Sequence, residues 1–167
     1  MVFLGAYRKK VYPLRHRIVN ELPSFCQEKG WRYLVKGRPP GKTIERNIEK
    51  LKSEGYIVGD LYGKVIASSK IFLFGNSIFR YPLSKYFEIM GSRTLVMANE
   101  PQNAKDLGFV DGENYISVDT GNWKEKLDYY LENDDERERI ALNGYNHVRQ
   151  HHSVERRSKQ LIDFLEK

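Results

Sequence analysis

Short apolar segments alternate with longer amphipathic segments along this chain, and that alternation constrains its fold more than any other feature. The apolar segments have the length and composition of strands, whereas the longer ones repeat apolar residues at helical spacing. Strands separated by helices are typical of a parallel sheet covered on both faces. The sequence therefore predicts one α/β domain over residues 1–167, with a doubly wound, six-stranded, Rossmann-like parallel sheet and extra C-terminal helices. The predicted strands are residues 2–4, 31–36, 56–59, 71–74, 94–97 and 114–118.

Residues that start and stop helices delimit the segments between these strands. Pro13 begins the first predicted helix and Gly30 ends it, while Thr43 and Gly55 delimit the second. Further helices are predicted over 61–68, 83–91 and about 103–107. The last fifty or so residues predict three more, with candidate caps at Thr120 or Asn122, at Asp134 or Asp135, and at Ser153.

The strand order predicts where a ligand would bind. Because crossovers between parallel strands are right-handed, six strands in this pattern favour the order 3-2-1-4-5-6. The order then reverses direction between the first and fourth strands, and ligands bind beyond the carboxyl ends of strands at such a switch point. This rule selects two loops, residues 5–10 and residues 75–88.

The first of these loops is basic. It leaves its strand at Gly5, continues with Arg8, Lys9 and Lys10, and is followed by Arg15 on the first helix. Glycine lets the backbone approach a ligand closely, a helix N-terminus favours anions, and arginine can grip two phosphate oxygens. A diphosphate fits this chemistry. A solvated basic turn with no ligand is the alternative interpretation.

The second loop ends at the start of a helix with Lys85, Tyr86 and Glu88. Its backbone N–H groups would face the same crevice as the first loop. A carboxylate there can accept two hydrogen bonds from a ribose diol, as acidic residues do in dinucleotide folds. Alternatively, Glu88 only interacts favourably with the helix dipole.

Charge and composition limit the class of protein. Residues 1–85 hold 17 Lys and Arg against 6 Asp and Glu, whereas residues 86–167 hold 11 against 16. Such polarity attracts anions to one side, although an ordinary surface rich in lysine is the alternative. No apolar run approaches the roughly 18 residues of a membrane span. The single cysteine, Cys26, excludes an internal disulfide and fits a reducing compartment. We therefore expect a cytoplasmic protein, peripheral at a membrane surface at most.

Several familiar sites are missing from the sequence. It contains no Gly-x-Gly-x-x-Gly and no complete P-loop, which argues against nicotinamide, flavin or P-loop nucleotide chemistry. It also contains no Asp-x-Asp, a pair of carboxylates that could hold a metal ion. His147, His151 and His152 lie close together, but at a helix end where histidine is favoured electrostatically. We therefore expect no metal ion and no cofactor.

Residues 84–97 read Ser84-Lys-Tyr-Phe-Glu-Ile-Met-Gly-Ser-Arg-Thr-Leu-Val-Met. This stretch resembles the C-terminal, donor-binding half of GT-B glycosyltransferases. The similarity is greatest to the group 1, family 4-like branch that includes spore-maturation-type proteins. Its pattern is a basic residue, an aromatic residue, Glu, two apolar residues and Gly, followed by an apolar strand. Later stretches resemble the same branch in order and spacing; they are Asp106-Leu-Gly-Phe, Asp111-Gly-Glu-Asn, Trp123, Asn133-Asp-Asp-Glu-Arg and His152-Ser153.

This resemblance implies a nucleotide-sugar substrate and roles for individual residues. Glu88 matches the carboxylate that binds the donor ribose, and Lys85 is a further phosphate ligand. The turn beginning at Gly5 matches the diphosphate-binding turn, and the backbone around Val58 would flank the base. The implied nucleotide-sugar site is Gly5, Arg8, Lys9, Lys10, Arg15, Val58, Lys85, Tyr86 and Glu88. No catalytic residue is implied.

Two departures from the family leave the function open. Many relatives carry a second Glu eight positions before the ribose-binding one, where this sequence has Arg80. The chain also begins at the first strand of the donor domain, without the N-terminal domain that supplies the acceptor site. We expect either the donor domain of an enzyme that transfers a sugar to an acceptor hydroxyl with a second domain or partner chain, or a non-catalytic nucleotide-binding module. A nucleic-acid-binding domain fits less well, because no motif interleaves aromatic with base-reading residues.

Overall fold

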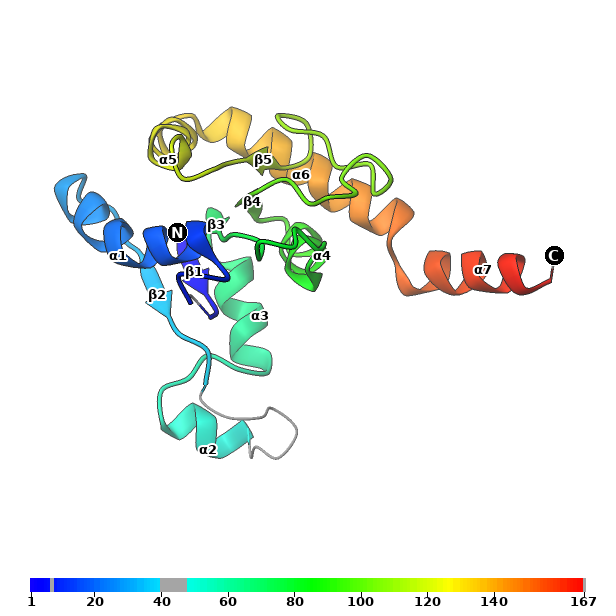
Figure 1. The fold of residues 1–167 in the computed structure, drawn as a ribbon, viewed down its shortest axis with the longest axis horizontal. Coiled ribbons are helices and arrows are strands. Elements are labelled where there is room, and N and C mark those ends of the chain that lie inside the picture. Colours follow the sequence, from blue (N-terminus) through cyan, green and yellow to red (C-terminus); the bar gives the residue numbers. More distant parts are fainter. Residues whose placement is uncertain (7, 40–47, 167) are drawn as a thin grey trace.

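A computed structural model describes residues 1–6, 8–39 and 48–166 of the chain (Figure 1). Its sheet has five strands in the order β2-β1-β3-β4-β5, and all neighbouring strands are parallel. The fold is therefore α/β, as the alternation of segments predicts. The strands are β1 (Val2–Leu4), β2 (Leu34–Lys36), β3 (Ile71–Leu73), β4 (Leu95–Ala98) and β5 (Ile116–Ser117).

The prediction of six strands is wrong at the third one, because residues 56–59 do not form a strand. Gly55 has a φ of +79° and ends the preceding helix, and the N–H of Tyr56 donates to the Leu51 carbonyl 2.9 Å away. Gly59, with a φ of +60°, then leads directly into the next helix. Residues 56–58 therefore connect two helix ends, and they pair with none of the five strands. The other five predicted strands all form, in the predicted order.

The helices lie close to their predicted positions. The predicted helix over 103–107 is instead a series of turns, in which the Leu107 N–H is shared between the Asn103 and Ala104 carbonyls. The predicted cap Thr43 lies outside the described residues. The helices are α1 (Pro13–Glu28), α2 (Ile48–Ser53), α3 (Asp60–Ala67), α4 (Ser84–Gly91), α5 (Trp123–Glu132), α6 (Asp134–His151) and α7 (Val154–Leu165).

The core is built on the central strands. All residues of β1, β3 and β4 are buried, as expected of parallel strands covered by helices. α1 adds an apolar stripe of Leu14, Ile18 and Leu22, ending at the buried free thiol of Cys26. α4 packs against α6, and both helices also contact β4. None of the helices in the described part of the chain is both long enough and apolar enough to span a membrane.

The last helix differs from the others because it has no buried residue. Ser153 caps it by accepting a hydrogen bond from the Arg156 N–H at 3.4 Å, as the sequence predicts. The helix then extends away from the rest of the domain (Figure 1). Its apolar side chains remain exposed, among them Val154, Leu161, Phe164 and Leu165.

We expect the substitution Gly144→Ala, in the middle of α6, to destabilise the fold by about 1–3 kcal/mol. A Cβ atom at this position would lie 2.6 Å from the Asn114 carbonyl oxygen and 3.2 Å from Cγ of Met90, so α6 must move away from its neighbours. Urea unfolding at equilibrium measures the change. The matched control is Gly63→Ala in α3, where nothing lies within 4 Å of the new methyl group. That control should gain about 0.5–1 kcal/mol from its higher helix propensity, and an equal effect of both substitutions would contradict the packing argument.

Candidate functional site

A pocket of about 470 Å³ opens at the carboxyl ends of β1 and β2, beside the start of α4. Segments far apart in the sequence build it: the ends of β1 and β2, the first turns of α1 and α4, and α3. Four of its side chains are basic and one is acidic. The lining residues are Leu4, Gly5, Ala6, Tyr12, Arg15, Lys36, Gly37, Arg38, Pro39, Ile57, Tyr62, Leu83, Ser84, Lys85 and Glu88.

Gly5 forms the floor of this pocket, directly after β1. Its N–H continues the sheet by donating to the Lys36 carbonyl at 3.1 Å, and its φ of +145° is one that other residues rarely adopt. A Cβ atom here would lie 3.1 Å from Nζ of Lys85 and 3.6 Å from a guanidinium nitrogen of Arg15. Glycine therefore allows two cationic groups to approach the end of the strand.

Arg15 lies in the first turn of α1 and is 5% exposed. Its Nε donates to the Gly75 carbonyl after β3, and one terminal nitrogen donates to the Ala6 carbonyl at 3.1 Å. The guanidinium also stacks over the Tyr12 ring, 4.1 Å from its centroid. Burial lowers the pKa of Arg15, but a guanidinium stays charged in proteins. Arg15 thus joins the loops after β1 and β3 and brings a fixed positive charge to the pocket.

Lys85 lies in the first turn of α4, where its ammonium donates to the Leu4 carbonyl at the end of β1. Its Nζ also lies over the Phe72 ring, 5.3 Å from the centroid. Burial, reinforced by the charge of Arg15 and opposed by that of Glu88, lowers the pKa of Lys85 to about 8. No carboxylate in the described part of the chain forms an ion pair with Arg15 or Lys85. Two partly buried cations without a counter-ion favour binding of an anion.

Glu88 lies one turn after Lys85 on α4, and it is exposed. Its Oε2 accepts a hydrogen bond of 2.9 Å from the hydroxyl of Tyr62, on α3. Glu88 lines the pocket, and an ionised carboxylate has further acceptor positions besides the one that Tyr62 occupies. The site therefore has a cationic side, formed by Arg15 and Lys85, and an acceptor side, formed by Glu88.

The pocket brings together Gly5, Arg15, Lys85 and Glu88 from the predicted set, and leaves the others out. Arg8, Lys9 and Lys10 are exposed on the loop after β1 but do not line the pocket. Val58 does not line it either; its neighbour Ile57 does. Tyr86 is fully buried in the core, with its hydroxyl donating to the Asn99 carbonyl.

Several lining residues were not predicted from the sequence. Lys36 ends β2 and Arg38 follows it, and their position beside the switch point is a signal that could have found them. Tyr12 and Tyr62 carry no such signal, since tyrosines before or within a helix usually pack on its surface. Only the approach of α3 to α4 places Tyr62 beside Glu88.

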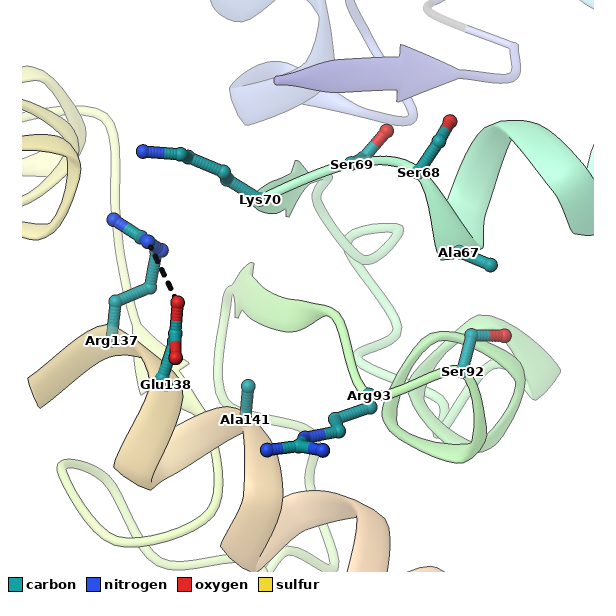
Figure 2. A pocket seen from close by; sticks show the side chains of 9 residues that line it. All are labelled: Ala67, Ser68, Ser69, Lys70, Ser92, Arg93, Arg137, Glu138 and Ala141. Atoms are coloured by element: carbon teal, nitrogen blue, oxygen red, sulfur yellow. Dashed lines mark ion pairs between the residues drawn. The ribbon is translucent and has the colours of Figure 1, made fainter. Parts of the chain in front are cut away.

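A second pocket, of about 550 Å³, lies at the other edge of the sheet, where β3 and β4 begin (Figure 2). Its cations have acidic partners: Lys70 lies 3.1 Å from Asp134, and Arg137 contacts Asp134 and lies 3.6 Å from Glu138. Arg93 follows the C-terminus of α4, where a positive charge complements the helix dipole. This pocket is therefore a weaker candidate for an anionic ligand.

The predicted histidine cluster is engaged with the backbone. His147 and His152 each place Nε2 within 2.9 Å of the Leu107 carbonyl, and burial lowers the pKa of both. No group of three or more His, Cys, Asp or Glu suited to a metal ion occurs within residues 1–6, 8–39 and 48–166.

The amino-acid sequence matches the model of a family described as glycosyl transferase-like, over residues 10–163. The chain belongs to the glycosyl transferase-like family. The resemblance to group 1 glycosyltransferases predicted from residues 84–97 is thereby confirmed. No protein in the curated set matches the chain in sequence.

Three solved structures illustrate the similarity in fold to this glycosyl transferase-like chain. The C-terminal domain of a glycosyl transferase group 1 family protein (LpcC) from Francisella tularensis is 18% identical, with a TM-score of 0.67 over 92% of this chain and 86% of that one. A chain of the GtfA/B complex is 14% identical, with a TM-score of 0.65. The pneumococcal O-GlcNAc transferase GtfA, in complex with UDP and GlcNAc, is 13% identical, with a TM-score of 0.58. Each of these last two matches covers 99% of this chain and 35% of the other.

We expect the buried ammonium of Lys85 to titrate near pH 8. Because its pKa in the folded glycosyl transferase-like domain lies below the ordinary 10.5, protonated Lys85 opposes folding below pH 8, and this penalty disappears between about pH 8 and 10.5. The wild-type free energy of unfolding should therefore rise relative to that of Lys85→Met across this interval. Urea unfolding at several pH values measures the difference, and NMR of the lysine ε-carbons follows the titration. A difference independent of pH would contradict the assignment.

Proposed function

We propose that this chain is the donor-binding domain of a GT-B glycosyltransferase, and that the pocket beside α4 holds the nucleoside diphosphate of a nucleotide sugar. The observation that carries the proposal is the convergence of Gly5, Arg15, Lys85 and Glu88 on one pocket. They come from segments 80 residues apart in sequence. Family membership supports a donor-binding role independently of this geometry.

Each part of the ligand has a complementary part of the pocket. The diphosphate would lie between Arg15 and Lys85, near the N-termini of α1 and α4, whose dipoles also favour anions. The ribose diol would donate hydrogen bonds to Glu88. The base would lie against Ile57 and Tyr62 instead of Val58. The cationic lining would repel a divalent cation, which favours binding of the donor without a metal.

During transfer, the acceptor hydroxyl oxygen would form a bond to the anomeric carbon and give up its proton to the departing diphosphate, whose oxygen would leave that carbon with the bonding electron pair. Negative charge develops on the departing nucleoside diphosphate. Arg15 and Lys85 would stabilise that charge from positions fixed before the reaction, which is where electrostatic catalysis is most effective. Arg8, Lys9 and Lys10 are exposed beside this loop and would add longer-range attraction.

The acceptor site would come from a second domain or a partner chain. This chain spans about a third of the length of GtfA, and one of its structural relatives is a chain of the GtfA/B complex. We further propose a doubly wound sheet, because right-handed crossovers on either side of β1 place helices on opposite faces. Residues 1–167 would form this single domain, of the spore-maturation-type branch, in the cytoplasm.

One observation favours a non-catalytic binding module as the second candidate. Arg80 stands where many relatives carry a glutamate, and it donates two hydrogen bonds to the Glu100 carbonyl, at 3.1 and 3.2 Å. Its guanidinium also lies 3.6 Å from the Glu100 carboxylate. A cation in place of that glutamate argues against sugar transfer by this chain alone. Hydrolysis or transfer of a donor sugar, measured with and without a partner domain, distinguishes the two functions.

We expect one nucleoside diphosphate in a panel of UDP, GDP, ADP and dTDP to raise the melting temperature. A ligand present at about 100 times its dissociation constant adds roughly 2.7 kcal/mol to the free energy of unfolding. Glu88→Gln should remove most of this shift, because the amide replaces one acceptor oxygen with a donor. The matched control is Glu132→Gln, on the exposed surface of α5, which contributes nothing to the pocket. An unchanged shift in Glu88→Gln would remove Glu88 from the binding site.

A further inference from the structure

We propose that Tyr62 is a positioning residue that orients Glu88 for a ribose diol and so makes the pocket selective for ribonucleotides. The inference rests on the proposed function, because it assumes that the pocket binds a nucleotide. Neither the sequence motifs nor the family match assigns a role to this tyrosine. It lies on α3, 26 residues before Glu88.

Two helices hold the pair in place. The hydroxyl of Tyr62 donates to Oε2 of Glu88 at 2.9 Å, linking α3 to α4. The Tyr62 N–H donates to the Gly59 carbonyl at 3.1 Å in the first turn of α3, so the tyrosine backbone is fixed. The Glu88 carbonyl accepts a hydrogen bond of 2.9 Å from the Ser92 hydroxyl at the end of α4. The contact therefore joins two ordered elements on the wall of one pocket.

Tyr62 is held in the form that can donate. Burial, followed by the charge of Glu88 and their hydrogen bond, raises the pKa of the Tyr62 hydroxyl above its ordinary value of 10. The hydroxyl therefore keeps its proton at neutral pH and acts as a hydrogen-bond donor to the carboxylate.

The hydrogen bond leaves Glu88 with enough acceptor capacity for a diol. An ionised carboxylate has about four lone-pair positions, and Tyr62 occupies one of them on Oε2. Within residues 1–6, 8–39 and 48–166, no other side chain donates to this carboxylate and no cation forms an ion pair with it. Two ribose hydroxyls can therefore bind without displacing Tyr62.

Tyr62 would fix the orientation of the exposed Glu88 carboxylate before a ligand binds. A free Glu side chain samples many rotamers and loses that freedom when it binds a ligand. A hydrogen bond from a fixed tyrosine restricts the carboxylate before the ligand arrives, so less ordering remains at binding. The benefit concerns only the ribose hydroxyls, since Arg15 and Lys85 contact the diphosphate through other atoms.

The test compares each ribonucleotide with its analogue that lacks the ribose hydroxyls. The probes are UDP, GDP and ADP with their 2′,3′-dideoxy forms, and dissociation constants come from isothermal titration calorimetry. We expect Tyr62→Phe to weaken binding of the preferred ribonucleotide about tenfold and to leave binding of its dideoxy form unchanged. Glu88→Gln should abolish the preference for the ribose hydroxyls. The double variant should bind the ribonucleotide no more weakly than Glu88→Gln does.

The matched control is Tyr129→Phe. Tyr129 makes the same kind of contact, a hydroxyl donating to Oε2 of Glu136 at 2.6 Å, on α5 and α6 away from the pocket lining. This substitution should change neither dissociation constant. It separates loss of a tyrosine–glutamate hydrogen bond in general from loss of this particular one.

The outcomes distinguish the inference from the function on which it rests. If Glu88→Gln loses the ribose preference but Tyr62→Phe binds both probes like the wild type, the role of Tyr62 is overturned and the nucleotide site stands. Equal weakening of both probes by Tyr62→Phe would also overturn it, because the tyrosine would then act by packing. If the wild-type chain binds none of the nucleotides, the proposed function itself fails.

Discussion

β1 pairs with β2 on one side and with β3 on the other, and the pocket depends on this double pairing. Val2 lies opposite both Leu34 and Phe72, so the first residues of the chain are central to the sheet. Parallel pairing sends all three strands in one direction and brings their carboxyl ends to one edge. The connection after β1 leads to β2 on one side, whereas the connection after β3 leads to β4 on the other side. Loops separated by some 70 residues therefore meet where Gly5 ends β1.

The charges at this edge are arranged differently from those elsewhere on the domain. Arg15 and Lys85 both donate to backbone carbonyls at the ends of strands, and neither has a carboxylate partner among the described residues. Around the second pocket, Lys70 and Arg137 share the carboxylate of Asp134. Backbone carbonyls hold a cation in position without neutralising it. The pocket beside α4 thus keeps its positive potential for a ligand, whereas the other pocket is largely compensated.

Prediction from sequence succeeded where the signal was local and failed where a partner element decided the outcome. The apolar runs at 71–74 and 94–97 form central strands because they are too apolar to lie anywhere but in the core. Residues 56–58 are also mostly apolar, but Gly55 and Gly59 on either side, both with positive φ, place them between two helix ends. In the site, the switch-point rule selected the loops after β1 and β3, and residues from both loops line the pocket. The rule could not separate Arg15, which lines the pocket, from Arg8, which does not. Their positions depend on how α1 packs after the end of β1.

The sequence by itself determined the fold class, the order of the five strands and the family, because hydrophobic periodicity and short motifs are properties of neighbouring residues. It also predicted that the loop after β1 and the start of α4 would meet at one edge of the sheet. Only the tertiary structure decided which of those side chains line one pocket, that Tyr86 belongs to the core, and that Tyr62 reaches Glu88. The physical reason is that side-chain direction depends on how helices pack across the sheet. That packing is set by contacts between residues distant in sequence, which no local pattern encodes.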